Sequence, residues 1–320
     1  MVLYAGAYGT LFKNGVFGVL KMQFIPVKME LKPRIDAITK SWGEGSCQHS
    51  FVTMYALQEK YGDSVCMENG MLYVSRDHLS DGRFRTCLMP MGAGSIRDAV
   101  ERLLEDTHSR GMKLKLFPVT ENAAEVLRQS FPDRFRLTPE RDWAEYLYSS
   151  RKLVELNGSE LAGKRRSIRL FYRDLPGKAE VLPLTPEIAG EVESFHERWL
   201  VENKLTHDAA ALERELRSVR LLLGQQRELG VMGFVVTVDG VIRGYCFGAP
   251  LSQEVFDAII MKGDRDVRHL YAFMYQELGR LGSCCEYINF EEDLGIAGLR
   301  ECKLSYGPDR MLNKFCAEEL

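Results

Sequence analysis

The feature that most constrains the fold of this chain is a succession of elements that occurs in both halves of the sequence. The first half is expected to start with two helices, at 33–38 and 51–61. A strand at 71–74, a strand at 84–89, a glycine-containing turn at 90–95, a helix at 96–110, a strand at 114–119 and a helix at 121–131 are expected to follow. The second half is expected to run helix, helix, hairpin, strand, helix, strand, over 186–203, 209–229, 233–248, 255–261, 267–281 and 286–290. Short apolar runs between amphipathic helices predict a sheet that is covered by helices.

Local signals fix several of these boundaries. Asp239-Gly240 between two apolar runs predicts a type I′ hairpin turn, because such a turn needs positive φ at both positions. Ser95, with an acidic residue three positions later, is expected to cap the helix that follows it. Asp264 or Asp266 is expected to cap the last long helix of the second half.

The element order predicts the fold class. Two helices, a hairpin, a strand, a helix and a strand is the order of the GNAT acyltransferase fold, and the first half shows a weaker version of it. We therefore expect an α/β (α+β) protein of two tandem GNAT-like acyltransferase domains, each a mixed sheet flanked by helices. The expected parts are a mobile or upstream-start extension at 1–21, a first domain at 22–142, a joining strand and basic helix at 143–178, and a second domain at 179–320.

Composition excludes several classes of protein. The chain has 320 residues, of which 45% are hydrophobic, and its net charge is 42 − 45 = −3. It has no run of the ~20 apolar residues that a membrane helix needs, and it is not cationic enough for a protein that coats nucleic acid. The eight cysteines form no C-x-x-C pair and no zinc-ligand spacing, so we expect no metal, reduced thiols and a cytoplasmic location.

The joining segment is chemically distinct. Residues 151–178 carry eight basic and three acidic residues, a net charge of 8 − 3 = +5 within a chain whose net charge is −3. On a helix, Arg165 and Arg169 lie four residues apart on one face, with Arg166 beside them. Arginine forks bind phosphate well, so this helix is a candidate contact for tRNA; the alternative is a solvated helical face with salt bridges.

Two stretches carry a resemblance to a known family. RDWAEYLYSSRKLVELNGSELAGKRRSIRLFYRD and INFEEDLGIAGLRECKLSYGP resemble the C-terminal domain family of phosphatidylglycerol lysyltransferases, and most of all its soluble, stand-alone members. The resemblance implies tandem GNAT-fold transferases that use aminoacyl-tRNA. It also matches Lys303 to a lysine of the family's motif. In the family a large aromatic residue tends to follow the proline that matches Pro308, whereas this chain has Asp309 at that position, so the identity of the acceptor is not implied.

The densest group of candidate site residues directly follows the last predicted strand and consists of Asn289, Glu291, Glu292 and Asp293. Asp293 or Glu292 is expected to accept a proton or bind an ammonium, and Lys303 to bind a phosphate or an oxyanion. The other expected substrate-binding residues of this cluster are Asn289, Arg300 and Tyr306. The alternative is that Asp293 caps the next helix while Arg300 and Lys303 line its exposed side.

The glycine-containing turn bears on the donor. Gly92 and Gly94 in PMGAGS precede a helix and weakly match a turn that binds the pyrophosphate of coenzyme A. The corresponding turn of the second half, KGDRDV, carries two carboxylates that repel a pyrophosphate.

These features lead to one principal hypothesis and two rivals. The principal hypothesis is an acyl- or aminoacyltransferase with aminoacyl-tRNA as the suspected donor, a lipid or a small amine or hydroxyl compound as acceptor, and transient contact with membrane lipid. The rivals are a coenzyme A-dependent N-acetyltransferase and a non-catalytic protein that binds a polar metabolite or a lipid head group.

Overall fold

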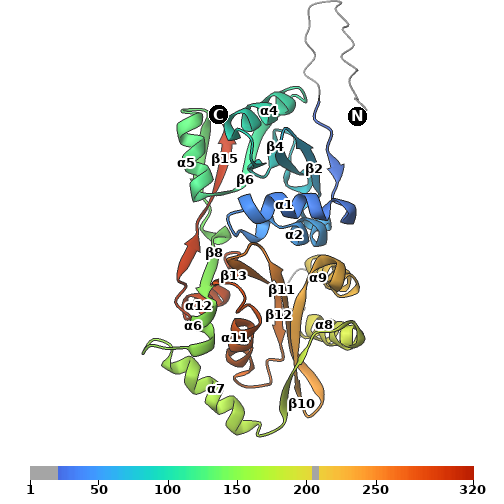
Figure 1. Ribbon diagram of the computed structural model, residues 1–320, viewed down its shortest axis with the longest axis vertical. Coiled ribbons are helices and arrows are strands. Elements are labelled where there is room, and N and C mark those ends of the chain that lie inside the picture. The colour runs from blue at the N-terminus through green and yellow to red at the C-terminus, as the bar shows by residue number, and fades with distance from the viewer. Residues whose placement is uncertain (1–20, 204–208) are drawn as a thin grey trace, which may run out of the picture.

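The computed structural model describes residues 21–203 and 209–320. The expected extension therefore lies outside the described residues, apart from Lys21. The described chain forms two sheets, one toward each end of the long axis (Figure 1).

The first sheet is built mainly from the first half of the chain. Its strand order is β1 (Ile25–Pro26), β2 (Asp63–Glu68), β3 (Met71–Arg76), β4 (Phe84–Cys87), β6 (Lys113–Thr120), β15 (Lys314–Glu319) and β7 (Phe135–Pro139), and β5 (Met91–Gly92) pairs with β3. The accompanying helices are α1 (Lys32–Trp42), α2 (Phe51–Ala56), α3 (Gln58–Tyr61), α4 (Ile96–His108) and α5 (Glu121–Ser130).

The second sheet is built mainly from the second half. Its strand order is β14 (Arg310–Leu312), β8 (Glu145–Ser149), β13 (Tyr287–Glu292), β12 (Val255–Gly263), β11 (Val241–Pro250), β10 (Met232–Val238) and β9 (Ala179–Pro183). Its helices are α6 (Ser150–Glu155), α7 (Ala162–Asp174), α8 (Ala189–Asn203), α9 (Ala209–Gly224), α10 (Gln226–Leu229), α11 (Leu270–Leu281) and α12 (Ala297–Leu304).

Both sheets are organised around one parallel pair of strands. β4 pairs in parallel with β6, and the helix α4 lies between them in the sequence; β12 pairs in parallel with β13, and the helix α11 lies between them in the sequence. The neighbouring strands β3 and β11 run antiparallel to these pairs. The mixed sheets flanked by helices that the sequence predicts are therefore present in both halves.

The two sheets exchange one strand each. β8 comes from the first half of the chain and lies between β13 and β14, while β15 comes from the end of the chain and lies between β6 and β7. Residues 314–319, which we grouped with the second domain, thus complete the first sheet instead. The physical reason is pairing: β15 forms a ladder with both neighbours, which satisfies its backbone groups on both edges.

Two local predictions are confirmed. Asp239 and Gly240 have φ values of 52° and 76° between β10 and β11, as a type I′ turn requires. Ser95 caps α4, because its hydroxyl accepts a hydrogen bond from the backbone N–H of Asp98 at 3.2 Å.

Two other local predictions are wrong. α11 begins after His269, which has a φ of 67°, and not after a capping aspartate. Asp264 lies too far before Leu270 to cap the helix; its Oδ1 instead accepts a hydrogen bond from the N–H of Asp266 at 3.0 Å, and its Oδ2 is ion-paired with Arg243 at 2.9 Å. The single helix expected at 51–61 is divided at Leu57 into α2 and α3.

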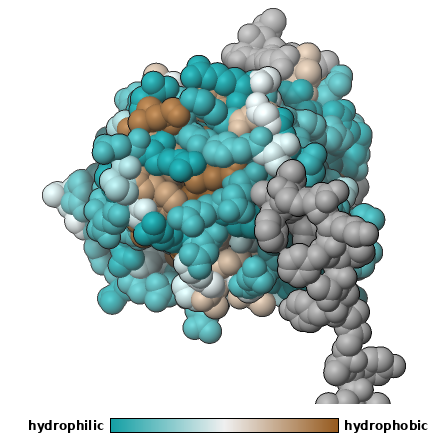
Figure 2. Space-filling view, turned by 90° about the horizontal axis from the view of Figure 1, so that it is seen from above, coloured by the Kyte–Doolittle hydropathy of each residue, from teal (hydrophilic) through white to brown (hydrophobic). Residues whose placement is uncertain are grey.

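The two halves share part of their hydrophobic core. One buried cluster contains Phe51 and Met54 from α2 together with Phe195 from α8, Val219 from α9 and Tyr245 from β11. This packing joins the helices of the first half to the α8–α9 side of the second sheet. Seen from the end that carries the first sheet, the surface is mainly hydrophilic with small hydrophobic patches (Figure 2). Among the described residues, no helix has both the length and the apolar character needed to cross a bilayer.

Candidate functional site between the two halves

The parallel pair of the second sheet opens partway along its length. The pairing of β12 with β13 ends at Asp257 and Asn289, although both strands continue. We call the place where they separate the β12–β13 opening, and Asp257, Asn289, Glu291 and Glu292 are its polar residues. Polar groups gathered at the end of a strand pairing can meet a ligand without breaking the sheet.

The chain at the end of β13 is held in an irregular conformation. Its pairing with β8 shifts register between Asn289 and Glu292, and Glu291 has a φ of 58°. The Oδ1 atom of Asn289 accepts a hydrogen bond from the N–H of Glu291 at 2.7 Å. The Lys303 ammonium donates to the carbonyl groups of Phe290, Glu291 and Glu292 at 2.6, 3.2 and 2.5 Å. Lys303 therefore fixes this bulge, and its three N–H bonds are already used.

A loop of the first half covers the opening. Gln48 donates a hydrogen bond from Nε2 to Glu292 at 2.7 Å, and the Cys47 Sγ lies 3.6 Å from the same carboxylate. The Nδ2 group of Asn289 donates to the carbonyl of Gly45 at 2.9 Å. The site thus depends on both halves of the chain.

A buried ion pair lies where the two exchanged strands start. Glu145, the first residue of β8, and Lys314, the first residue of β15, are 2.6 Å apart and almost fully buried. Glu145 also accepts hydrogen bonds from the Ser46 hydroxyl at 2.7 Å, the Cys47 N–H at 3.1 Å and the Asn289 amide at 2.5 Å. This network ties the covering loop, both exchanged strands and β13 together.

The opening contains carboxyl groups with raised pKa values. Burial, together with the neighbouring Glu292, raises the pKa of Glu291 to about 8. Burial and the charge of Glu291 also raise the pKa of Asp257 well above its usual range. A carboxyl group with a pKa near neutrality is suited to exchange a proton with a substrate.

Cys47 is not prepared to act as a nucleophile. Burial and the nearby Glu145 and Glu292 raise the pKa of its thiol well above the usual range. The reactive form of cysteine is the thiolate, and this environment disfavours it.

Three groups in the network have the spacing of metal ligands. Cys47, Glu145 and Glu292 each place one ligand atom within 4.8 Å of the others. Lys314 already supplies a cation to Glu145, and Gln48 hydrogen-bonds Glu292. Glu145 therefore has a cation partner and Glu292 a hydrogen-bond donor within the protein itself.

Asp293 and Arg300 form a separate ionic cluster beside the opening. Arg300 donates two hydrogen bonds to Asp293, at 2.9 and 2.7 Å, and Arg141 donates one at 3.1 Å. The Tyr146 hydroxyl and the Gly295 N–H also donate to this carboxylate. The hydrogen bonds from Arg300 and Tyr146 keep the pKa of Asp293 well below its usual range, despite its burial. Asp293 is thus a stable anion with its oxygens occupied, and it is not the cap of α12, whose N-cap is Ile296.

Tyr306 lies away from the opening. Its ring is buried and stacks on Tyr275 at 4.3 Å, with the Lys164 ammonium 4.0 Å from the ring centroid. These contacts place Tyr306 between α11 and the start of α7, so it packs the second half and does not reach the carboxyl groups of the opening.

The arginines of the basic helix divide into two roles. Arg165 donates hydrogen bonds to the carbonyls of Leu156 and Gly158, which fixes the turn before α7. Arg166 and Arg169 are exposed, at the end of the molecule opposite the first sheet (Figure 1). Only these two of the three predicted arginines present a free face for phosphate.

The glycine turn of the first half serves packing. A Cβ atom at Gly92, which has a φ of 146°, would lie 2.1 Å from the carbonyl oxygen of Gly70. The N–H of Gly94 donates to the sulfur of Met71 at 3.2 Å. Close approach to the β2–β3 turn explains both glycines, and the Gly94 amide is not free for a pyrophosphate.

The structure therefore brings together only part of the predicted site. Asn289 and Glu292 lie in the opening, Lys303 supports it, and Asp293 and Arg300 flank it. Sequence reasoning placed Glu291 in the same cluster without giving it a role, and it missed the other members of the network, which are Cys47, Gln48, Glu145, Asp257 and Lys314. One of them had a visible signal: Asp257 is a lone charge inside the apolar run VFDAIIM.

Two sheets, each with a parallel pair joined by a helix, define the class of GNAT-like acyltransferase folds. The chain belongs to the phosphatidylglycerol lysyltransferase C-terminal family, whose model matches residues 39–318.

Solved structures share the fold of this chain. A conserved protein of unknown function from Bacteroides thetaiotaomicron is 28% identical, with a TM-score of 0.87 over 93% of this chain and 100% of that one. L-PGS from Bacillus licheniformis is 13% identical, with a TM-score of 0.64 over 94% of this chain and 93% of that one, a likeness of fold.

A curated relative matches in sequence over a shorter region. An uncharacterized protein of Mycoplasmoides gallisepticum is 22% identical over 173 residues, which are 53% of this chain. The match covers 54% of that protein, so the chain spans about half the length of the curated relative it matches.

Proposed function

We propose that this chain is a GNAT-like aminoacyl transferase whose reaction takes place at the β12–β13 opening. The observation that carries the proposal is the set of carboxyl groups there, above all Glu291 with its pKa of about 8. Family membership supports an aminoacyl group as the group transferred, and the fold supports direct transfer in an opened sheet.

Glu291 is the proposed general base. An attacking hydroxyl or amine must lose a proton as its bond to the donor carbonyl forms, and a carboxylate of raised pKa accepts that proton effectively. The ester oxygen of the donor then leaves and takes up a proton in turn. Because the Cys47 thiol is held protonated, the proposed route is direct transfer without an enzyme-bound intermediate.

Aminoacyl-tRNA is the proposed donor. In the first half, packing occupies the glycine turn that would hold a pyrophosphate. In the second half, the turn before α11 carries Asp266 on its surface, while Arg243 neutralises Asp264. The exposed Arg166 and Arg169 on α7 supply the proposed phosphate contacts, and the proposed acceptor is a lipid or a small amine or hydroxyl compound.

A transfer assay tests the proposal. Radiolabelled lysyl-tRNA or alanyl-tRNA is incubated with the protein and either phosphatidylglycerol vesicles or putrescine, and the label that leaves the tRNA for the acceptor is counted. We expect transfer by the unaltered protein and a loss of about 10²–10⁴-fold in Glu291→Gln, because the general base is removed.

The matched control is Glu254→Gln, the same change at an exposed position just before β12, which should leave the rate unchanged. If no label leaves either tRNA while the protein consumes acetyl-CoA with putrescine, the chain is a coenzyme A-dependent acetyltransferase and the proposal fails.

A further inference from the structure

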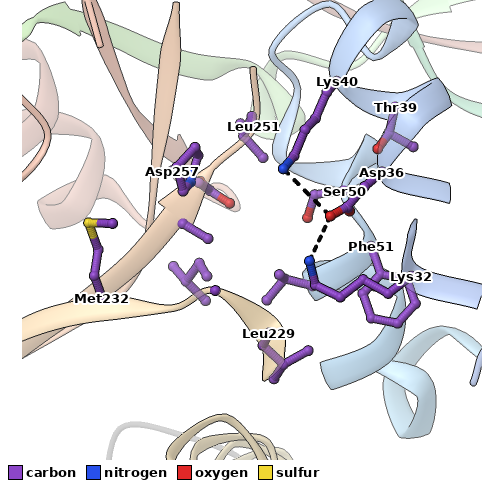
Figure 3. A pocket seen from close by; sticks show the side chains of 15 residues that line it. Lys32, Asp36, Thr39, Lys40, Ser50, Phe51, Leu229, Met232, Leu251 and Asp257 are labelled. Carbon is purple, nitrogen blue, oxygen red and sulfur yellow. Dashed lines mark hydrogen bonds and ion pairs between the residues drawn. The ribbon is translucent and has the colours of Figure 1, made fainter. Parts of the chain in front are cut away.

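A second feature of the molecule is a pocket between the two halves. Its volume is about 180 Å³, which is the space of about six water molecules at ~30 Å³ each. One wall comes from α1 and α2 of the first half, and the other from β10, β11, β12 and the turn before β10 (Figure 3). Its apolar lining includes Phe51, Leu229, Met232 and Leu251.

One wall of this pocket carries a carboxylate without a partner. Asp257 is 1% exposed, and neither of its oxygens has a hydrogen-bond donor among the described residues. Figure 3 shows it across the pocket from Lys40 and Asp36. A buried polar group normally has its hydrogen bonds satisfied, since leaving it unpaired costs about 1–3 kcal/mol. An unpaired carboxylate lining a cavity therefore points to a ligand that supplies N–H donors.

The opposite wall carries an excess of positive charge. Lys32 and Lys40 both contact the single carboxylate of Asp36, at 2.6 and 3.5 Å. Two ammonium groups share one carboxylate, which leaves one positive charge for an anionic group of a ligand. Lys40 is half exposed, so it can turn toward such a group.

We propose that this pocket binds a small zwitterion, with its ammonium group on Asp257, its anionic group at Lys32 and Lys40, and an apolar stem between them. The ligand class is an amino acid-like or aminoalkyl phosphate-like molecule. The same chemistry occurs in a free metabolite and in the head group of phosphatidylethanolamine. The pocket shares Asp257 with the β12–β13 opening, but the proposed binding goes beyond the proposed transfer because it needs no tRNA.

The charge on Asp257 gives the proposal a signature. Burial and Glu291 raise the pKa of Asp257, while Glu145 and Glu292 add to the effect and Lys303 opposes it. A bound ammonium stabilises the ionised carboxylate, so binding should release a proton. A ligand that offers only an anion should release none.

Titration calorimetry in buffers of different ionisation enthalpy tests the proposal, with 5-aminopentanoate, pentylamine and pentanoate as probes. We expect 5-aminopentanoate to bind with release of a proton, pentylamine to bind several-fold more weakly with the same release, and pentanoate not to bind. Asp257→Asn should weaken the binding of 5-aminopentanoate at least tenfold, whereas the control Asp266→Asn, on an exposed turn, should leave its affinity unchanged.

Thermal unfolding of the same variants shows whether a loss of binding results from a loss of folding. Asp257→Asn replaces an unpaired carboxylate by a neutral amide of similar size, so its melting temperature should equal or exceed that of the unaltered protein. A lower melting temperature would mean that Asp257 has a structural role, and the proposal would fail.

The source of the ligand is decided by a further comparison. Co-sedimentation with phosphatidylethanolamine vesicles that depends on Asp257 would assign the site to a lipid head group, and binding of 5-aminopentanoate alone would assign it to a free molecule. Absence of both, or equally tight binding of pentanoate, overturns the proposal. Failure of the transfer assay would leave these results untouched.

Discussion

The two parallel strand pairs of this molecule have the same topology and opposite chemistry. In the first sheet the pairing of β4 with β6 ends at Cys87 and Leu116, and the residues that follow include the buried Leu88, Met89 and Val119. In the second sheet the pairing ends at Asp257 and Asn289, and on β13 the charged Glu291 and Glu292 come within the next three residues. One pair closes on apolar side chains, while the other keeps polar groups in the interior.

This difference shows how a duplicated fold can divide its work. Apolar residues after the first pair contribute packing energy, which stabilises the sheet. Polar residues after the second pair cost stability, and the first half compensates by covering them with the loop that holds Cys47 and Gln48. The first half thus acts as a structural partner to the site of the second.

The largest expected effect concerns Lys314, which joins the first sheet to the second through its ion pair with Glu145. Lys314→Met leaves Glu145 buried without its cation, so the free energy of unfolding should fall by about 3–5 kcal/mol. Urea denaturation followed by circular dichroism measures it. The double variant Glu145→Leu/Lys314→Met should recover part of the loss, and Arg97→Met, in an exposed ion pair of α4, should cost at most about 1 kcal/mol. A loss as small as that of Arg97→Met would show that the two halves do not depend on this pair.

The second effect is a pH dependence of stability that Glu291, beside the β12–β13 pair, contributes. Below pH 8 the folded protein keeps a proton on Glu291 that the unfolded chain releases near its ordinary pKa of 4.5. The folded state therefore binds more protons in this window, and the free energy of unfolding contributed by Glu291 falls as pH rises from 4.5 to about 8.

Glu291→Gln should remove part of the ~1.4 kcal/mol per pH unit that one fully linked proton gives. Urea midpoints between about pH 5 and 8 measure the slope, with Glu254→Gln as the control. An unchanged slope would mean that Glu291 has an ordinary pKa in the folded protein, which contradicts the raised pKa on which its proposed role as general base rests.

The smallest effect concerns the exposed arginines of α7. Arg166→Ala/Arg169→Ala should weaken tRNA binding several-fold. It should also lower the slope of log Kd against the logarithm of salt concentration by about one to two, because fewer counterions are released. The matched control removes two arginines from the first half, Arg97→Ala/Arg128→Ala, with the same change of net charge. Filter binding at several salt concentrations measures both, and equal effects would show that binding follows net charge and not this helix.

The sequence predicts those features that depend on neighbouring residues. The turn at Asp239-Gly240 and the cap at Ser95 each involve contacts within a few positions, so the pattern contains the information. The cap predicted at Asp264 is wrong because the helix starts later, at Leu270, after His269 adopts a positive φ. The Asp264 carboxylate instead pairs with Arg243 of the neighbouring strand β11, a long-range contact that the order of residues does not reveal.

The site was harder to predict for the same reason. Glu292 and Asn289 were found because polar residues cluster after a strand, whereas Glu145 and Cys47 join them only through the exchange of strands and the packing of the two halves. Arg165 was predicted to bind phosphate, but the turn before α7 uses it. The composition of a helix shows its charge and not which of its arginines are already bound.

The exchange of strands also fixes the order in which the molecule can be completed during synthesis. β6 and β7 emerge from the ribosome early, but the strand that lies between them, β15, follows only after the whole second sheet has been made. Until then the first sheet has an unfilled gap with exposed backbone edges, a surface on which chaperones act and at which aggregation begins. The nascent chain therefore cannot finish its first sheet before its second, and shortening the chain before 314 would leave this gap permanently open.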